Sequence, residues 1–197
     1  MQSAARIAEQ LEAHAFRIVT VNLGDMPGAA LTDWNTAVPE YEAGNCIKST
    51  YFPARNTIFL SFALGWAESV GAEKIFFGAN LADYHAFPDT RLEYLQAFTK
   101  MAQLATKTGV QNEATIAIEA PLLTMDKPAI IKLGLELGVD YSLSTTCYQA
   151  NVMGLACGIC DSCVIRKNAF IELGLADPAK YPPYCSQKNL AKIENPA

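Results

Sequence analysis

The clearest structural signal lies in residues 56–78, which read Asn56-Thr-Ile-Phe-Leu-Ser-Phe-Ala-Leu-Gly-Trp-Ala-Glu-Ser-Val-Gly-Ala-Glu-Lys-Ile-Phe-Phe-Gly78. Residues Asn56–Val70 are apolar nearly all round a helical projection, which predicts a helix buried on more than one side. Gly71 comes next and is a typical helix stop. Lys74–Phe77 then predicts a short buried strand, which ends at Gly78. The segment is therefore one helix–strand repeat of an α/β protein.

The same alternation continues on both sides of this segment. The pattern predicts helices over Ser3–Ala13, Asp89–Thr106 and Asp126–Leu137, strands over Phe16–Leu23 and Thr115–Ile118, and irregular chain over Gly24–Phe52. Helices that alternate with short β-branched strands favour an α/β fold with a parallel sheet. Ligands of such sheets bind beyond the carboxyl ends of the strands. We therefore expect the chemistry in the loops after Phe77 and Ile118.

Composition places the chain among globular proteins. It has 197 residues, of which 51% are hydrophobic and 18% charged, and these values exclude intrinsic disorder. A chain of this length builds one core without a disulfide scaffold. The formal net charge of −5 disfavours general binding of nucleic acid through a basic surface. The most apolar uncharged run, residues 56–67, is far shorter than the roughly 20 residues that a membrane span needs.

The amino terminus and the cysteine content bear on the compartment. Residues 1–6 run into Glu9 and Glu12 without the apolar core of a signal peptide, so we expect a cytoplasmic protein with reduced thiols. The chain has six cysteines, namely Cys46, Cys147, Cys157, Cys160, Cys163 and Cys185. In a reducing compartment, cysteines that cluster indicate metal ligation rather than disulfides.

Four of these cysteines form a cluster with metal-ligand spacing. Cys157-Gly-Ile-Cys160-Asp-Ser-Cys163 has two-residue spacers, and Cys147 lies ten positions before Cys157. Four thiolates complete a tetrahedral shell around zinc, and the spacers let backbone turns point successive sulfurs inward. Gly158 suits the tight first turn because glycine tolerates positive φ. A helix that starts at Asp161 puts Cys163 in its first turn, where the dipole favours thiolate. We expect a structural zinc site with no open coordination position.

Other interpretations of the cysteines stay open. The four thiols could be buried without a metal, or they could hold an iron–sulfur cluster. The bacterial ferredoxin pattern requires a further cysteine and then a proline, where this chain has Lys167 and Asn168. Cys46 and Cys185 are interpreted as thiols outside the cluster. A nucleophilic role for Cys46 and a substitute-ligand role for Cys185 are the alternatives.

Two polar segments are candidates for ligand binding. In Pro53-Ala-Arg55-Asn56, Asn56 could cap the apolar helix, or Arg55 could bind an anion near the helix N-terminus. The second segment, Gly78–Arg91, follows a buried strand and is rich in hydrogen-bonding side chains. Its Asn, Asp and Arg side chains could bind a heterocycle while Tyr84 or Phe87 stacks on it. The alternative is a turn with Asp89 near the start of the next helix.

Taken together, these residues resemble the 7-cyano-7-deazaguanine synthase family of queuosine biosynthesis, the preQ0 synthases or QueC family. The resemblance rests on four segments: Pro53-Ala-Arg55-Asn56, then Gly78-x-Asn80-x-x-Asp83-Tyr84 with Pro88-Asp89-x-Arg91, then Thr146-Cys147-Tyr148, and finally Cys157-Gly-x-Cys160-x-x-Cys163-x-x-Arg166-x-x-Ala169-Phe170. It runs from about residue 4 to residue 187. The order of all four segments is highly specific, although the cysteine run alone would not be.

The resemblance implies a fold, a reaction and a set of site residues. The fold is a Rossmann-like parallel sheet of the adenine nucleotide alpha-hydrolase type over residues 1–144, with a zinc-binding segment over residues 145–197. The reaction is the ATP-dependent ligation of 7-carboxy-7-deazaguanine and ammonia, through adenylated intermediates and an amide, to 7-cyano-7-deazaguanine. Cys147, Cys157, Cys160 and Cys163 fall on the four zinc positions. The expected contacts to the base and to ATP with Mg²⁺ are Arg55, Asn56, Gly78, Asn80, Asp83, Tyr84, Asp89 and Arg91. Family members tend to pair, so a homodimer is compatible with the resemblance.

One departure from the family pattern is visible in the sequence. The family opens with a strand and a Ser-Gly-Gly-x-Asp-Ser loop whose amides cradle the pyrophosphate of ATP. This chain contains no Gly-Gly pair, and its first helix corresponds to the second helix of the family. The expectation is an internal fragment, a late start codon or a degenerate relative. The alternative function is therefore a non-catalytic, zinc-stabilised α/β protein from the same family.

Overall fold

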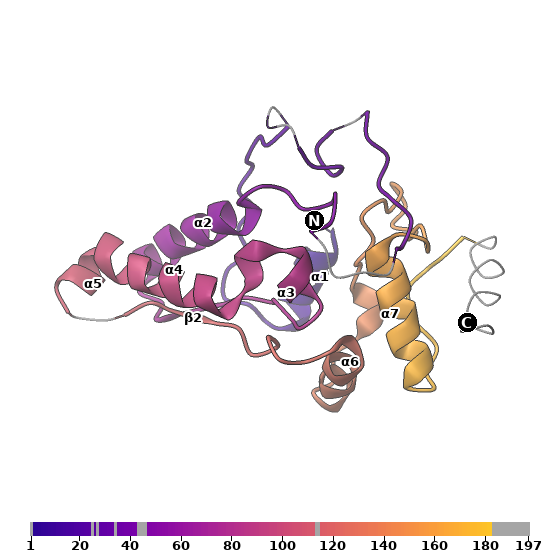
Figure 1. Cartoon of the computed structure of the whole chain (residues 1–197). Helices are drawn as coiled ribbons and strands as arrows, with labels where there is room; N and C mark the ends of the chain where they lie inside the picture. The colour runs from indigo at the N-terminus through magenta and orange to yellow at the C-terminus, as the bar shows by residue number, and fades with distance from the viewer. Residues whose placement is uncertain are drawn as a thin grey trace. The chain divides into compact units, whose positions relative to one another are not determined.

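The computed structural model describes residues 2–24, 26, 28–33, 35–42, 47–112 and 115–182 (Figure 1). Its contacts group the chain into two compact units, one of residues 1–43 and 131–197 and the other of residues 44–130. This grouping is by contact and differs from the family-based division at residue 144, which stays a prediction. Among the described residues, no helix is long and apolar enough to cross a membrane.

The unit of residues 44–130 contains the sheet. Its elements are α2 (Arg55–Val70), β1 (Lys74–Phe76), α3 (Asp83–Ala86), a 3₁₀ helix η1 (Pro88–Thr90), α4 (Leu92–Ala105), α5 (Lys107–Val110) and β2 (Ala117–Glu119). The strands pair in parallel, with Lys74 opposite Ala117 and Phe76 opposite Glu119. Parallel neighbours need a crossover connection, and α4 provides it while packing on β2 (Figure 1). The predicted parallel α/β arrangement is confirmed for these two strands.

The core of this unit lies between α2 and α4. Leu60, Leu64 and Ala67 face it from α2, at the i, i+4, i+7 spacing of one helix face. Leu95, Phe98, Ala102 and Ile116 complete the buried cluster. The prediction that α2 is buried on more than one side is wrong for the described residues, because Phe59, Phe62 and Trp66 are 47–50% exposed. A sheet of two strands and one crossover helix covers a single face of α2.

The other unit is formed by helices and long connections. Its elements are α1 (Gln2–Gln10), a 3₁₀ helix η2 (Tyr141–Leu143), α7 (Asp161–Glu172) and the greater part of α6 (Lys127–Glu136). α6 and α7 lie side by side, with Ile131 packed against Ala169 and Phe170 (Figure 1). Gly138 follows α6 with a φ of 77°, the left-handed conformation that ends a helix. The carboxyl end of α7 thus has a small core of its own.

Residues 16–23 differ from the sequence prediction. The β-branched pattern predicts a strand over Phe16–Leu23, yet the structure assigns no helix or strand to these residues. Ile18 and Val19 are 61% and 59% exposed. A strand requires a partner edge as well as a favourable sequence, and the sheet of the described residues consists of β1 and β2.

The prediction that residues 74–77 form a buried strand is wrong as to burial, because Lys74 and Phe76 of β1 are exposed, Phe76 to 71%, and Ile75 is half-buried. Alternate side chains of a strand point to opposite faces, and the helices of this unit pack on one face of the two described strands.

The other predicted elements are confirmed with small shifts at their ends. The predicted strand Thr115–Ile118 is β2, which begins two residues later at Ala117. The predicted helix Asp89–Thr106 is interrupted near its start, because Pro88–Thr90 form a 3₁₀ turn and α4 begins at Leu92. No helix or strand is assigned to the described part of residues 24–52, as predicted.

Candidate metal centre and substrate loops

The four clustered cysteines converge in the unit of residues 1–43 and 131–197. The sulfurs of Cys147, Cys157, Cys160 and Cys163 all lie within 4.8 Å of one another. Cys160 is the residue before α7, and Cys163 lies in the first turn of that helix. A tetrahedral ion with Zn–S bonds of about 2.3 Å separates its sulfurs by about 3.8 Å. The Cys157 and Cys163 sulfurs are 3.9 Å apart, so the set fits one tetrahedral ion.

Backbone N–H groups point at the sulfurs. Cys147 Sγ accepts from the N–H of Gln149 at 3.2 Å and from the N–H of Cys157 at 3.1 Å, and Cys157 Sγ accepts from the N–H of Cys160 at 3.4 Å. The bond from Cys160 to Cys157 closes the turn that the first two-residue spacer predicts. Gly158 has a φ of 78°, which confirms that this turn needs a glycine. Donors aimed at sulfur stabilise the thiolate, which is the form that binds metal.

Burial and mutual hydrogen bonding shift the thiol pKa values apart. Cys160 and Cys163 are 0% and 1% exposed. The hydrogen bond from Cys163 lowers the pKa of Cys160 to about 5, while the same bond raises the pKa of Cys163. Burial raises the pKa of Cys147. One thiolate therefore forms readily, and further thiolates in the same buried space require a cation beside them.

The four described cysteines of the cluster lie close enough together to hold one metal ion. No disulfide joins the four cysteines. An iron–sulfur cluster puts several of its own atoms between the thiolates, whereas sulfurs this close fit a single ion. Soft thiolates in a tetrahedral set select a metal such as zinc. Cys46 and Cys185 lie outside the described residues, so their predicted roles are untested.

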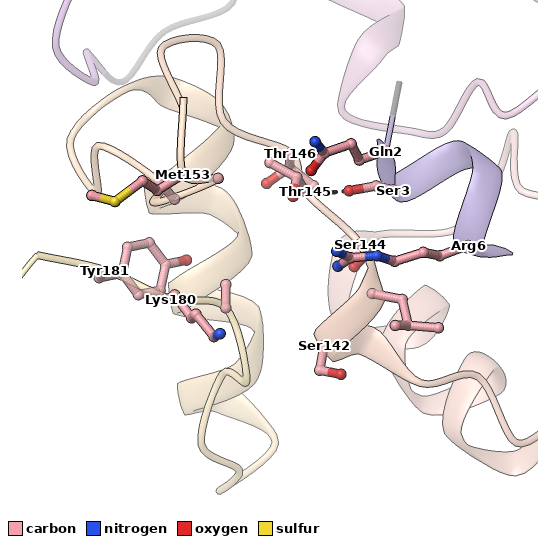
Figure 2. Close-up of a pocket in the computed structure, with 14 residues that line it drawn as sticks. Gln2, Ser3, Arg6, Ser142, Ser144, Thr145, Thr146, Met153, Lys180 and Tyr181 are labelled. Atoms are coloured by element: carbon pink, nitrogen blue, oxygen red, sulfur yellow. Dashed lines mark hydrogen bonds between the residues drawn. The ribbon is translucent and has the colours of Figure 1, made fainter. Parts of the chain in front are cut away.

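Figure 2 shows a polar pocket of about 190 Å³, whose lining shares Ala156 and Tyr181 with the residues packed around Cys160 and Cys163. Ser142, Ser144, Thr145 and Thr146 line it, as do Arg6 and Lys180, and Ser3 Oγ lies 3.3 Å from Thr145 Oγ1. The sequence prediction did not include this pocket. The signal that could have indicated it is the hydroxyl run immediately before Cys147.

The loop after β1 is held by its own side chains. Asn80 donates to Asp83 Oδ2 from its backbone N–H at 3.0 Å and from its side-chain amide at 2.6 Å. Asn80 Oδ1 accepts in turn from the N–H of Ala82 at 3.1 Å. Burial raises the pKa of Asp83. The pair fixes the conformation of the loop that begins at Gly78, which is where the sequence predicted a ligand site.

Two arginines of this unit lie against aromatic rings. The Arg55 guanidinium is 5.9 Å from the ring centroid of Phe87, and the Arg91 guanidinium is 5.1 Å from that of Tyr84. Arg91 Nε also donates to the Tyr84 carbonyl oxygen at 3.0 Å. These contacts orient planar cationic groups that can hydrogen-bond a carboxylate or phosphate in bidentate fashion.

The expected cap of α2 is replaced by another residue. Asn56 was an alternative N-cap, but α2 begins at Arg55 and Ala54 occupies the cap position with a φ of 54°. The Asp89 carboxylate accepts from the Asn56 N–H instead, at 2.9 Å, in a buried position. The structure therefore joins Asn56 with Asp89, Asn80 with Asp83, and Tyr84 with Arg91. Whether these residues bind substrate stays a prediction.

The comparisons with known proteins agree with this geometry. The profile described as "Queuosine biosynthesis protein QueC" matches residues 1–174. This chain belongs to the QueC family. The match covers both the 44–130 unit, with its polar loops, and all four clustered cysteines. Family membership supports the parallel, Rossmann-like sheet of which β1 and β2 are the described strands.

Curated relatives of this QueC-family chain are named 7-cyano-7-deazaguanine synthase. The protein from Coxiella burnetii (strain Dugway 5J108-111) is 50% identical over 179 residues, which are 91% of this chain and 79% of the relative. The one from Nitrosococcus oceani is 49% identical over 181 residues, 92% of this chain and 80% of the relative. The one from Acinetobacter baylyi is 51% identical over 180 residues, 91% and 78% respectively.

Proposed function

We propose that this QueC-family chain converts 7-carboxy-7-deazaguanine and ammonia to 7-cyano-7-deazaguanine at the expense of ATP. The observation that carries the proposal is the identity of about one residue in two to proteins named for this product, over nine tenths of the chain. The proposed partners are small molecules, in a cytoplasmic setting, with self-association into a homodimer.

The proposed reaction activates one carbon twice. The substrate carboxylate attacks the α-phosphorus of ATP, so pyrophosphate leaves and an acyl adenylate forms. Ammonia then adds to the acyl carbon, and AMP leaves together with a proton to give the amide. A second ATP adenylates the amide oxygen with release of another pyrophosphate, and loss of AMP and of the two amide protons gives the nitrile. Cationic side chains and backbone N–H groups stabilise the charge that develops at phosphorus and carbon.

We assign the substrate contacts to the residues that the sequence singled out. Arg55 and Arg91 are the anion ligands, because both guanidinium groups are oriented by aromatic rings. Asn80 and Asp83 are the hydrogen-bonding pair for the heterocycle, and Tyr84, 38% exposed, is the stacking ring. Asn56, Asp89 and Gly78 shape the ends of the two loops. Mg²⁺ would accompany ATP as its counterion.

Zinc is the proposed resident ion of the cysteine cluster. Four thiolates would fill its coordination shell, so it would supply structural stabilisation rather than Lewis-acid chemistry. The support is the donor set itself, with sulfurs within 4.8 Å of one another and three N–H···S bonds. Cys147, Cys157, Cys160 and Cys163 are the assigned ligands.

A second candidate function is a non-catalytic, zinc-stabilised relative that keeps the site for the base. It is favoured by the described residues themselves, which combine the hydrogen-bonded loop of Asn80 and Asp83 with the cysteine cluster.

One set of measurements separates these functions. The purified chain is titrated calorimetrically with 7-carboxy-7-deazaguanine and is then incubated with that compound, ammonium and Mg-ATP. Mass spectrometry follows the nitrile and AMP. Release of both products supports the synthase, and binding without turnover supports the non-catalytic relative. A chain that neither binds the base nor turns it over contradicts both. Metal content and colour are measured on the same sample, since an iron–sulfur protein is brown and a zinc protein is colourless.

A further inference from the structure

Arg166 forms a buried network close to the cysteine cluster. Its side chain is 4% exposed and pairs with Asp177, whose side chain is 7% exposed, at 2.9 Å between Nη2 and Oδ1. All three nitrogens of Arg166 have partners. Nε donates to both Asp177 oxygens at 3.0 and 3.1 Å, Nη1 donates to Ser144 O and Oγ at 3.2 and 2.8 Å, and Nη2 also donates to Tyr141 O at 2.9 Å. A buried arginine with this many partners has one conformation.

The network joins the two parts of the chain that carry the zinc ligands. Arg166 lies one helical turn after Cys163 in α7, and Ser144 lies three residues before Cys147. Thr146 Oγ1 also donates to Ser162 O, at 3.5 Å. Arg166 therefore fixes the approach of the Cys147 loop to the helix that carries Cys163.

Asp177 extends the network to the segment that follows α7. Its carboxylate accepts from the Ala179 N–H at 2.9 Å and from the Tyr181 hydroxyl at 2.6 Å. The N–H of Ala156, directly before Cys157, donates to Lys180 O at 2.9 Å. Residues 177–181 are thus tied both to α7 and to the chain at Cys157.

Tyr181 is the residue of this network that contacts the cysteine cluster. Its side chain packs against the cluster of Ala156, Cys160 and Cys163. Its hydroxyl donates to the Asp177 carboxylate at 2.6 Å. The Lys167 ammonium lies 4.5 Å from the centroid of the same ring. The ring is therefore held in place by its hydroxyl on one side and a cation on its face.

We propose that residues 177–181, anchored by the Arg166–Asp177 ion pair, form a cover that retains the metal of the cysteine cluster. Arg166 and Asp177 are positioning residues in this role, and Tyr181 is the side chain that shields the sulfurs. A zinc–thiolate bond is lost when water or a competing ligand reaches the ion. A cover that must first detach slows this exchange without adding a ligand. The proposal rests on the metal assignment made above.

The test measures the rate of zinc release. The zinc-loaded chain is mixed with excess 4-(2-pyridylazo)resorcinol, and the absorbance of the zinc complex is followed. Tyr181→Phe removes the hydrogen bond to Asp177 but keeps the ring, and we expect release about tenfold faster, the effect of one charge-assisted hydrogen bond. Asp177→Asn leaves Arg166 without a buried counter-charge and should accelerate release further. The matched control is Tyr94→Phe, which removes a half-buried hydroxyl contact to Thr57 Oγ1 at 2.9 Å in the other unit.

The outcomes distinguish this inference from the metal assignment. Faster release from the Tyr181→Phe chain, with unchanged release from Tyr94→Phe, supports the cover. Equal rates in the wild-type and Tyr181→Phe chains overturn it, as does the same acceleration in Tyr94→Phe, which would indicate general destabilisation. Urea midpoints of all chains are measured alongside, because a merely structural role of Tyr181 would lower the midpoint and leave native-state release unchanged. A wild-type chain that holds no zinc contradicts the metal assignment itself.

Discussion

The Asp89 carboxylate caps helix α2 from 33 positions further along the chain, through a 2.9 Å hydrogen bond from the backbone N–H of Asn56. The first N–H groups of a helix have no partner within it, and a carboxylate beside them also interacts favourably with the helix dipole. Asp89 is 6% exposed, so the contact is shielded from solvent. Because Arg55 begins α2, Asp89 also links the two segments that carry the proposed substrate contacts.

Replacing Asp89 should therefore lower the free energy of unfolding by an amount that depends on the new side chain. Asp89→Ala removes the cap, and we expect a loss of about 1–2 kcal/mol in the free energy of unfolding. Asp89→Asn keeps one acceptor oxygen and should lose less than half as much. Urea unfolding followed by circular dichroism measures both. The control is Asp126→Ala, which removes an exposed cap contact to the Ala129 N–H at 2.9 Å. Equal losses for the alanine and asparagine variants of Asp89 would contradict the cap.

Replacing either of two helical glycines by alanine should change the free energy of unfolding, but in opposite directions. Gly65 in α2 has open space where a Cβ would be, so Gly65→Ala should raise the free energy of unfolding by about 0.5–1 kcal/mol through helix propensity. Gly134 in α6 faces the Tyr141 hydroxyl at a distance that leaves no room for a Cβ. Gly134→Ala should instead lower it by about 1–3 kcal/mol, the typical cost of overpacking.

The same urea titrations measure both variants, and each glycine is the control for the other. Stabilisation by Gly134→Ala would show that Tyr141 moves aside freely. Such a movement of Tyr141 would also disturb the hydrogen bond that its carbonyl oxygen accepts from Arg166 Nη2 at 2.9 Å.

Features that neighbouring residues determine could be predicted from the sequence, whereas features that depend on residues far along the chain could not. The helices could be predicted because apolar spacing and stop glycines such as Gly71 act within a few residues. The strand over Phe16–Leu23 could not, since pairing depends on a partner elsewhere in the chain. The clustering of the cysteine sulfurs could be predicted because two-residue spacers encode a local turn. Arg166 and Asp177 were missed as a pair because charged residues 11 positions apart are usually separate and exposed.

Replacing one sulfur ligand should release the metal. Cys160 is fully buried, and Cys160→Ser removes one of the four assigned sulfur ligands. We expect metal content near zero, a lower thermal midpoint and poorer solubility, because structural zinc contributes on the order of 10 kcal/mol to folding in small zinc domains. Elemental analysis and calorimetry measure these effects.

A second cysteine variant controls for the loss of a thiol as such. Cys46→Ser alters a cysteine outside the predicted ligand set and should leave metal content at one ion per chain. Chelation of the wild-type chain with EDTA should reproduce the lower midpoint of Cys160→Ser, and added Zn²⁺ should restore it. Unchanged metal content and midpoint in Cys160→Ser would contradict the ligand assignment.

The proposed role of Arg91 predicts a difference between two ligands. If the guanidinium binds the carboxylate of the substrate, Arg91→Ala should lower the affinity for 7-carboxy-7-deazaguanine by about tenfold or more. This is the effect of losing a charge-assisted hydrogen bond. The nitrile product carries no such charge, so the affinity of the Arg91→Ala chain for the nitrile should fall much less. Arg91→Lys should fall between wild type and alanine for the acid, because a lysine cannot bind in bidentate fashion. Titration calorimetry of both ligands against the three chains provides the comparison.

A matched cation on the same unit completes this test. Lys74 forms an exposed ion pair with Glu119 at 3.2 Å, and Lys74→Ala removes a positive charge from β1, outside the set of proposed substrate contacts. It should leave the affinity for both ligands unchanged, since exposed pairs contribute little. Equal weakening of acid and nitrile in Arg91→Ala would show that Arg91 acts by holding Tyr84 and its loop, to which Nε donates at 3.0 Å, rather than by binding the anion.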